Sequence, residues 1–196
     1  MSAGSAAAYE TYGLEFLDAR DSSPIGREVV STWARSLSHA TDLLELGCGG
    51  GLPVTQALLD AGHKVWAVDS SPTLMAKFQQ RYPGIPVDCA LVQESAYFGR
   101  EFGAAAAIGL LFLLDAEDQS ALIHRISGVL EPGGRFLFTA PVETGTWADV
   151  ITGHQCRSLG RESYVTILAE AGFEVVGTYE DQGSNHYFEV EKIAAP

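Results

Sequence analysis

Hydrophobic residues recur along the chain with two alternating periods, and this alternation predicts the order of its elements. Short apolar runs bounded by glycine or proline are typical of buried strands, and apolar residues spaced three or four apart are typical of amphipathic helices. The predicted strands of the first two thirds of the chain lie at 42–46, 64–68, 87–92, 104–109 and 135–139. The predicted helices cover 24–37, a segment with Pro53 near its start, a segment opened by Ser71 and Pro72, and a segment that begins at Asp115 and ends near Glu131. Strands that alternate with helices predict a parallel sheet covered on both faces.

The last third of the chain follows a different pattern. A polar connection, 140–159, precedes a helix that ends at Gly172, a residue suited to the left-handed conformation at a helix C-terminus. Two apolar runs, 173–179 and 186–193, then flank a loop of turn-forming residues, which predicts a hairpin. The expected fold class is therefore α/β, with an open, doubly wound and mostly parallel sheet of about seven strands and an antiparallel C-terminal strand.

The length of 196 residues is typical of one domain, and we expect 1–196 to form a single domain. Within it we expect a disordered tail of small residues at 1–8 and an N-terminal helical segment or lid at 9–40. Apolar residues make up 46% of the chain and charged residues 19%, which is typical of a globular protein. No run approaches the roughly 18 apolar residues of a membrane span, so we expect a soluble protein.

Charge and cysteine usage narrow the range of partners. The chain has 12 basic and 25 acidic residues, a formal net charge of −13, and no cluster of lysine or arginine. A protein that binds a polyanion needs such a cluster, so we expect neither nucleic acid nor an anionic membrane surface as a partner. Cys48, Cys89 and Cys156 lie far apart without a Cys-x-x-Cys pair, which favours neither a metal site nor a disulfide framework and fits a cytoplasmic location.

Glycines gather where the first predicted strand meets the next helix, with Gly47, Gly49 and Gly51 spaced two apart. Such a loop lets a ligand approach free backbone N–H groups, although a tight turn alone also explains it. Asp69 closes the second predicted strand 22 residues after Gly47, where an acid can accept both hydroxyls of a ribose. A dinucleotide-binding loop requires a further glycine at position 52, which is Leu52, and no Gly-Lys-Ser/Thr exists to hold nucleotide phosphates.

In this setting residues 45–51 resemble the first motif of the class I S-adenosylmethionine-dependent methyltransferases. Residues 68–70, 93–95 and 130–134 follow in the order of the family's later motifs, and the resemblance covers about 9–192. It implies a Rossmann-like fold and S-adenosyl-L-methionine as cofactor. The resemblance also implies a cofactor site. Its methionine part would be held by Gly47, Cys48, Gly49 and Gly51, with Glu45 near the amino group, and its ribose would be bound by Asp69. The adenine would be bordered by Ser70 and Met75, its amine would face Glu94 and Ser95, and the pocket would be completed by Gly109 and Leu110.

Two departures from the family pattern bear on the ligand. Glu94 stands where the family commonly has aspartate, so its contact to the adenine shifts by a methylene, and a solvated loop carboxylate is the other interpretation. Residues 109–112 stand where enzymes that methylate amide or base nitrogens carry an Asn/Asp-Pro-Pro-Tyr/Phe signature. Together with the negative charge, this departure favours a small-molecule acceptor over a nucleobase.

The acceptor end follows from topology, because ligands of open α/β sheets bind outside the carboxyl ends of the strands. Of the five histidines, His154 and His186 are expected at that edge, and each is a candidate general base or a plain surface residue. The segments 142–159 and 182–187 are expected to form the walls of the acceptor pocket, with Tyr12, Trp147, Asn185 and Tyr187 as pocket residues. Tyr9, Tyr12 and Phe16 form either a lid over the cofactor or a packed N-terminal strip.

Three functions stay open on the sequence alone. The leading hypothesis is a methyltransferase that moves a methyl group in line from the cofactor to a small molecule. A catalytically silent S-adenosylmethionine-binding module keeps the same pocket without turnover. An NAD(P)-dependent oxidoreductase is disfavoured by Leu52. The acceptor atom, the use of a general base and the oligomeric state are not determined by the sequence.

Overall fold

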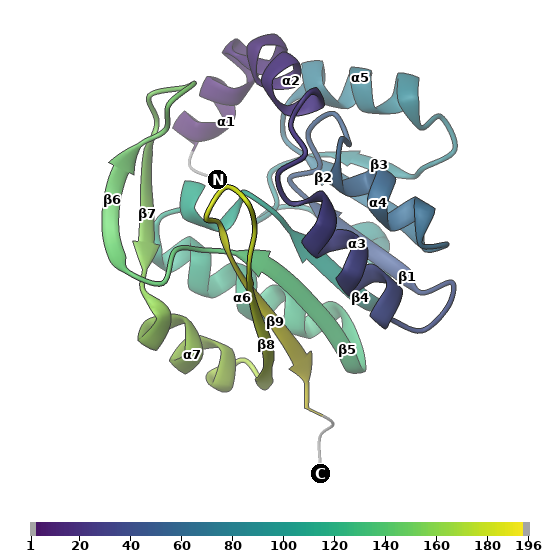
Figure 1. The fold of residues 1–196 in the computed structure, drawn as a ribbon, viewed down its shortest axis with the longest axis vertical. Helices are drawn as coiled ribbons and strands as arrows, with labels where there is room; N and C mark the ends of the chain where they lie inside the picture. Colours follow the sequence, from purple (N-terminus) through teal and green to yellow (C-terminus); the bar gives the residue numbers. More distant parts are fainter. Residues whose placement is uncertain (1–2, 194–196) are drawn as a thin grey trace.

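A seven-stranded sheet runs through the computed structural model, which describes residues 3–193, with side chains from residue 7 onward (Figure 1). The strand order is β3-β2-β1-β4-β5-β9-β8. The strands are β1 Asp42–Leu46, β2 Lys64–Asp69, β3 Val87–Cys89, β4 Phe102–Ala107, β5 Leu130–Thr139, β8 Phe173–Glu180 and β9 His186–Lys192. The first five are parallel to one another, and β9 is antiparallel to both β5 and β8. The predicted fold class is confirmed.

Helices cover both faces of the sheet. One face carries α3 Arg27–Ser36, α4 Val54–Asp60 and α5 Pro72–Arg81, and the other carries α6 Ala116–Val129 and α7 Arg161–Glu170. Two single-turn helices, η1 Tyr97–Gly99 and η2 Leu111–Leu113, lie in the loops beside β4. The four alanines at 104–107 of β4 are fully buried and alternate between the two core layers, so small side chains at the centre let both helix layers pack closely.

Local signals fixed several element boundaries as predicted. The strand at 42–46 has its predicted bounds, and the Ser71 hydroxyl accepts a hydrogen bond from the Leu74 amide at 3.2 Å as the N-cap of α5. Gly172, beyond α7, has the left-handed φ of +81°. The predicted antiparallel pair at the C-terminus forms β8 and β9.

Other boundaries differ from the prediction. The first predicted helix begins at Arg27 instead of residue 24, because Gly26 adopts a left-handed φ of +84° that starts the helix after it. The third predicted strand ends at Cys89 instead of residue 92, because the Leu91 carbonyl accepts hydrogen bonds from the amides of Glu94 and Ser95 and turns the chain.

The polar connection at 140–159 contains a separate β-hairpin that the sequence analysis did not predict. Strands β6 Thr144–Ala148 and β7 Gln155–Leu159 form their own two-stranded antiparallel sheet. Every residue of β6 is exposed, so the alternation of buried and exposed positions that reveals a strand is absent. The hairpin contacts the rest of the protein through Trp147, whose ring centroid lies 5.5 Å from that of Phe112.

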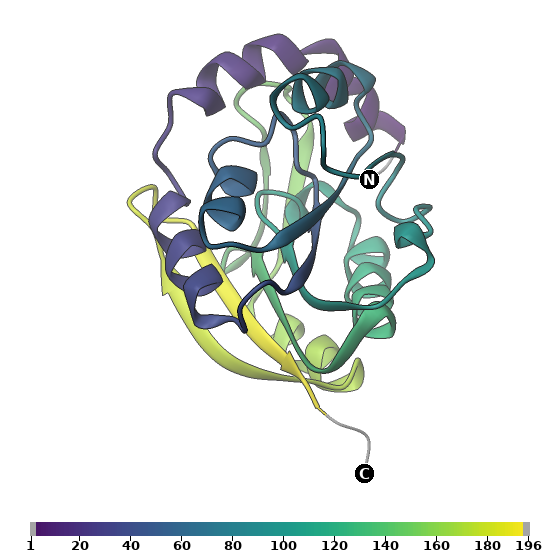
Figure 2. The same cartoon turned by 90° about the vertical axis from the view of Figure 1, so that its right-hand side faces the viewer.

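The N-terminal residues form two helices, α1 Ala3–Thr11 and α2 Gly13–Asp21, which lie across one end of the sheet (Figure 2). We expected a tail over 1–8, but helix replaces it from Ala3, because alanine has the strongest helix propensity and Glu10 anchors the helix to α5. Residues 1 and 2 of that expected tail lie outside the described residues. Between residues 3 and 193, no helix is long and apolar enough to cross a membrane.

Candidate functional site

The glycine-rich loop leaves the carboxyl end of β1 and is held against β2. The amides of Gly47 and Cys48 both donate to the Val68 carbonyl, at 2.8 and 3.3 Å. Gly49 has a left-handed φ of +54°, and a Cβ at this position would lie 3.2 Å from the Phe16 ring of α2. Glycine is therefore required at position 49 both for the backbone conformation and for the close approach of α2.

Asp69, the last residue of β2, binds this loop directly. One carboxylate oxygen, Oδ2, accepts a hydrogen bond from the Gly49 amide at 2.9 Å, and the other, Oδ1, accepts one from the Ser71 amide at 2.9 Å. Burial raises the pKa of Asp69, and the hydrogen bonds from Ser71 and Gly49 oppose that rise. The ends of β1 and β2 and the start of α5 are thus joined at a single side chain.

Glu45 lies beneath the loop and is 2% exposed. The Thr55 hydroxyl of α4 donates to its Oε2 atom at 2.7 Å. Burial raises the pKa of Glu45 to about 8, while the Thr55 hydrogen bond and the charge of Arg20 act in the opposite direction. At neutral pH this environment favours the uncharged carboxylic acid form of Glu45.

A cavity of about 220 Å³ opens at this edge of the sheet and collects groups from distant parts of the chain. It is lined by five residues predicted for the cofactor, namely Gly47, Gly49, Asp69, Gly109 and Leu110, and by two predicted for the acceptor, Asn185 and Tyr187. A smaller adjoining recess is lined by Glu45 and Cys48 together with Gly47 and Gly49. The structure therefore brings most of the predicted loop residues and part of the predicted acceptor wall into one place.

The β8–β9 turn forms the acceptor side of this cavity. The Tyr187 hydroxyl donates to Asp181 Oδ2 at 2.7 Å, and the Asn185 side-chain amide donates to both Asp181 oxygens at 3.0 and 3.1 Å. Burial and the Asp181 hydrogen bond raise the pKa of Tyr187, so its hydroxyl keeps its proton. The Arg20 guanidinium, from α2, donates to the Ile25 carbonyl at 2.9 Å beside this group.

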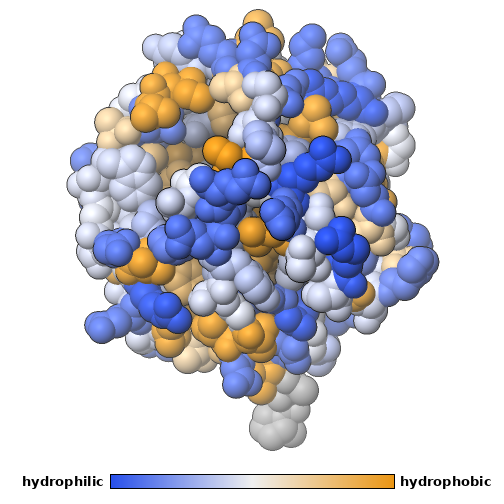
Figure 3. Space-filling view, viewed as in Figure 1, coloured by the Kyte–Doolittle hydropathy of each residue, from blue (hydrophilic) through white to orange (hydrophobic). Residues whose placement is uncertain are grey.

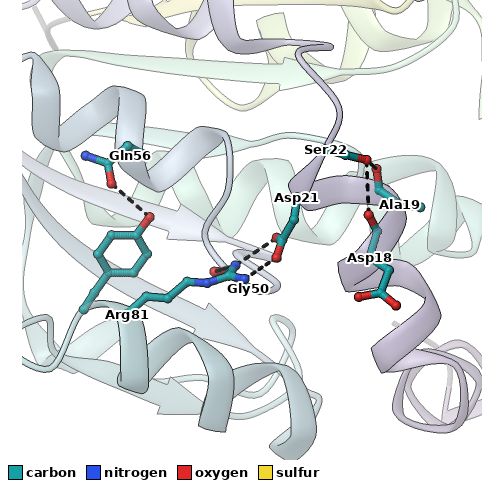
Figure 4. A network of polar contacts seen from close by, with 8 residues as sticks. Asp18, Ala19, Asp21, Ser22, Gly50, Gln56 and Arg81 are labelled. Carbon is teal, nitrogen blue, oxygen red and sulfur yellow. Dashed lines mark hydrogen bonds and ion pairs between the residues drawn. The ribbon is translucent and has the colours of Figure 1, made fainter.

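Helices α1 and α2 form a roof over the cavity. The Glu10 carboxylate accepts hydrogen bonds from the Ser71 hydroxyl, the Thr73 hydroxyl and the Thr73 amide, at 2.5, 2.6 and 3.1 Å. At the other end of the roof, Arg81 of α5 pairs with Asp21 and donates to the Gly50 carbonyl at 2.9 Å (Figure 4). The roof is therefore attached to the same loop and helix that form the floor of the cavity.

The turn of the β6–β7 hairpin, which lies beside α1, forms another part of the rim (Figure 1). A hydrophobic patch is visible at this turn in Figure 3, and Val150 there is 96% exposed. Asp149 of the same turn lines the cavity, as does Tyr9 of α1. The Tyr9 hydroxyl interacts with the Asp149 carboxylate, and burial together with that carboxylate raises the pKa of Tyr9.

Several predicted site residues do not line the cavity. Met75 is buried in the core, with its sulfur 3.6 Å from the Cys48 thiol. The Ser95 hydroxyl is engaged within the protein, because it donates to Asp88 at 2.7 Å and accepts from the Tyr97 amide at 3.0 Å. The remaining predicted residues outside the lining are Ser70, Gly51, Glu94, Tyr12 and Trp147, of which Tyr12 and Trp147 are 38% and 37% exposed.

The two candidate catalytic histidines also lie outside the lining. His186 places its Nδ1 atom 3.8 Å from Glu180 Oε2, while its neighbours Asn185 and Tyr187 line the cavity. His154 lies in the β6–β7 turn, where its backbone carbonyl accepts a hydrogen bond from the Asp149 amide at 2.7 Å. A catalytic role for either histidine stays a prediction.

Four polar or titratable lining residues were not predicted to bind a ligand: Tyr9, considered only as a lid residue, and Arg20, Thr139 and Asp149. Thr139 ends β5 and accepts a hydrogen bond from the Gly109 amide at 2.6 Å. Thr139 lies at a strand end and Asp149 lies in the connection that follows. Both positions could have been identified by the rule that ligands of open α/β sheets bind outside the carboxyl ends of the strands. The sequence contains no signal that would identify Arg20 as a lining residue, because the pattern of a helix does not show that α2 crosses the carboxyl ends of the strands.

Comparison with known proteins shows what the chain is similar to. Residues 43–134 match the sequence profile of a family described as a methyltransferase domain. A search among curated proteins finds no relative of this chain. The 1,6-didemethyltoxoflavin-N1-methyltransferase of Burkholderia thailandensis, solved with 1,6-didemethyltoxoflavin and S-adenosylhomocysteine, is 20% identical with a TM-score of 0.81, covering 98% of this chain and 89% of that one.

Two further solved structures share the fold. The CcbJ methyltransferase of Streptomyces caelestis is 20% identical, with a TM-score of 0.73 and coverage of 94% of this chain and 98% of that one. The glycopeptide N-methyltransferase MtfA, solved with S-adenosylmethionine, is 20% identical, with a TM-score of 0.70 and coverage of 89% and 96%. Residues 43–134 thus match a methyltransferase domain family over just under half of the chain, which agrees with the resemblance that the sequence motifs indicate, and the whole chain shares its fold with these solved methyltransferases.

Proposed function

We propose that the protein is an enzyme that transfers a methyl group from S-adenosylmethionine to a small-molecule acceptor. One observation carries this proposal: the glycine-rich loop and Asp69 line the same cavity as Asn185 and Tyr187 of the β8–β9 turn. The first set suits a nucleoside joined to an amino acid, and the second offers polar and aromatic contacts to another molecule. A cavity with both sets can hold a methyl donor and an acceptor in contact.

The residues at the floor of the cavity fit this cofactor. Asp69 accepts backbone hydrogen bonds from Gly49, Ser71 and Ser70, and the roughly four acceptor positions of a carboxylate leave room for a ribose hydroxyl. Among the described residues, Arg20 supplies the one positive charge that lowers the pKa of Glu45, and a ligand ammonium beside Glu45 would likewise favour its carboxylate form. Leu74 and Leu110 supply apolar walls for the rest of the ligand. These are the residues that would hold the cofactor.

When bound, S-adenosylmethionine supplies a methyl group on a positively charged sulfur, which a nucleophile displaces in line. The part of the protein is then mainly to position and enclose the two ligands. The loop at 47–51 and Asp69 orient the donor side, and Tyr187 with Asn185 orients the acceptor side. The α1–α2 roof, attached through Glu10 and Arg81, excludes water from the space between them.

A small molecule is a better acceptor for this site than nucleic acid. The chain carries a net charge of −13, and the cavity of about 220 Å³ is lined by residues of both the roof and the β6–β7 turn. The Burkholderia neighbour was solved with 1,6-didemethyltoxoflavin, so this compound is a rational first probe of the acceptor side. All three cysteines are free thiols, which supports our expectation of a reducing, cytoplasmic compartment.

Calorimetry followed by a product assay tests the proposal. We expect the purified protein to bind S-adenosylmethionine and S-adenosylhomocysteine more tightly than NAD or ATP. Methyl transfer from isotopically labelled S-adenosylmethionine is then measured by mass spectrometry with a metabolite panel that includes 1,6-didemethyltoxoflavin. Tighter binding of NAD would contradict the cofactor assignment, and tight S-adenosylhomocysteine binding without transfer to any acceptor would favour a binding module over an enzyme.

A further inference from the structure

Asp149 holds a fixed carboxylate at the rim of the cavity. It begins the turn between β6 and β7, and its Oδ1 atom accepts three hydrogen bonds: from the Ile151 amide at 3.1 Å, the Thr152 amide at 2.7 Å and the Thr152 hydroxyl at 2.8 Å. These donors orient the side chain. The residue also lines the cavity, so a carboxylate whose orientation is fixed by the turn lies at the rim.

Tyr9 faces this carboxylate from the roof. Its hydroxyl interacts with Asp149 and feels the charge of Asp69 from the cofactor side. Burial and the two carboxylates keep the tyrosine protonated, so a neutral O–H group is held beside Asp149. Tyr9 and Asp149 both line the cavity, so an O–H group on a flat ring already lies in the space between the roof and the β6–β7 turn.

The charges of the cavity restrict the acceptor further. Among the described residues that line it, the acids are Asp69 and Asp149 and the only base is Arg20. The charge of Arg20 is already offset by Asp181, and its guanidinium donates to the Ile25 carbonyl. An anionic acceptor would therefore meet uncompensated negative charge, and a neutral or cationic one would not.

We propose that Asp149 is the catalytic base of the methyl transfer, and that the acceptor is a neutral or cationic ring compound whose reacting N–H or O–H group takes the place of the Tyr9 hydroxyl. This inference rests on the proposed function. In the step, a bond forms between the methyl carbon and the acceptor nitrogen or oxygen while the sulfur–carbon bond breaks and leaves its electron pair on sulfur. The acceptor proton passes to the Asp149 carboxylate.

The other protonatable groups around Asp149 are poorer candidates for this role. Burial, with a contribution from Asp149 itself, raises the pKa of Cys156 to about 11, so it is a neutral thiol at physiological pH. The raised pKa of Tyr9 keeps its hydroxyl protonated at this pH, so the phenolate that could act as a base is not available. The His154 side chain does not line the cavity.

The test compares two variants of the same turn. Asp149→Asn keeps the Oδ1 acceptor and the turn but cannot take a proton, whereas Thr152→Ala removes one turn hydrogen bond and leaves the carboxylate in place. Both variants and the wild type are assayed for transfer to lumazine and 8-hydroxyquinoline, which must lose a proton, to quinoline, which has none to lose, and to the anion 2-naphthoate. Affinity for S-adenosylhomocysteine is measured in parallel.

We expect Asp149→Asn to lower kcat for the proton-bearing probes by about 10²–10⁴-fold, the usual effect of losing a general base. Thr152→Ala should change kcat for these probes by less than about threefold. With quinoline, Asp149→Asn should lower kcat by less than about tenfold. We expect no methyl transfer to 2-naphthoate. An equal loss with quinoline, an unchanged kcat, or no transfer to any probe by the wild type would overturn the role of Asp149. Failure of the wild type to bind S-adenosylhomocysteine would instead refute the proposed function.

Discussion

The Asp69 carboxylate accepts a hydrogen bond from the Gly49 amide at 2.9 Å, so the end of β2 directly fixes the conformation of the loop that follows β1. The second oxygen of the same carboxylate receives the Ser71 amide at 2.9 Å and fixes the start of α5. The sequence analysis assigned Asp69 to a ribose alone. In the structure, Asp69 also holds together the glycine-rich loop and the start of α5, which form the floor of the cavity.

The first prediction follows from this double role. Asp69→Ala should weaken S-adenosylhomocysteine binding by about 1–3 kcal/mol, because hydrogen bonds to a charged group and two amide partners are lost together. It should also lower the thermal midpoint, since the Gly49 and Ser71 amides are left without their acceptor. Calorimetry and thermal unfolding measure the two effects. Asp60→Ala, at an exposed carboxylate 4.0 Å from Arg27, serves as the control and should change neither.

A second prediction concerns the pH dependence of stability. Because burial raises the pKa of Glu45 from its usual 4.5 to about 8, the folded protein keeps a proton there that the unfolded chain loses. This residue therefore makes the free energy of unfolding fall as pH rises between about 4.5 and 8, by at most about 1.4 kcal/mol per pH unit.

Glu45→Gln removes that titration while its amide oxygen can still accept the Thr55 hydroxyl. The variant should gain stability over the wild type progressively from pH 5 to pH 8, as measured by urea unfolding across this range. A constant difference between the two proteins at every pH would show that Glu45 is ionised in the folded state.

The sequence predicted the fold where local signals agree with tertiary packing. The buried strand at 42–46 and the Ser71 cap are examples, because each depends on residues close in the chain. The β6–β7 hairpin escaped prediction since none of the β6 residues is buried, so no hydrophobic alternation marks the strand. Helix α1 escaped it because its docking depends on Glu10 meeting Ser71 and Thr73, more than 60 residues away.

The cofactor side of the cavity was more predictable than the acceptor side for the same reason. Gly47, Gly49 and Asp69 belong to ordered motifs with fixed spacing, and the structure places all three in one cavity. The acceptor side is assembled from three unrelated segments, namely the roof, the β6–β7 turn and the β8–β9 turn. A sequence shows that such segments reach the same edge, but not which side chains of each segment turn inward.

A third prediction tests whether the roof controls cofactor exchange. Glu10 receives three hydrogen bonds from Ser71 and Thr73, and these interactions lower the pKa of its carboxyl group. Glu10→Ala should therefore raise the dissociation rate of S-adenosylhomocysteine several-fold, measured by stopped-flow fluorescence, and increase amide hydrogen exchange in α1. Glu15→Ala, at an exposed position of α2, is the matched control.

The same attachment should weaken in acid. Since the pKa of Glu10 is lowered, the attachment is complete above the ordinary pKa of a glutamate and is lost only as pH falls through the lowered value. Dissociation from the wild type should thus accelerate at acidic pH, whereas Glu10→Ala should lack this component. Equal rates for the two proteins at neutral pH would indicate that the roof opens without breaking these contacts.

The last prediction decides between two candidates for the base. Along β9, Tyr187 lines the cavity and is 1% exposed, while the adjacent His186 pairs with Glu180 at 3.8 Å and keeps 32% of its side chain exposed. Successive side chains of a strand point to opposite faces, so the same geometry that turns Tyr187 inward turns His186 away. His186→Ala should leave kcat within about twofold and cost less than about 1 kcal/mol of stability, the usual worth of an exposed ion pair.

Tyr187→Phe, at the adjacent position of β9, is compared with His186→Ala. It keeps the ring and removes only the hydroxyl that donates to Asp181, so it should raise KM for the acceptor while S-adenosylhomocysteine affinity stays nearly constant. Steady-state kinetics and unfolding measured on both variants separate the two residues. A fall in kcat of about 10²–10⁴-fold in His186→Ala, with stability intact, would make the histidine the base and remove Asp149 from that role.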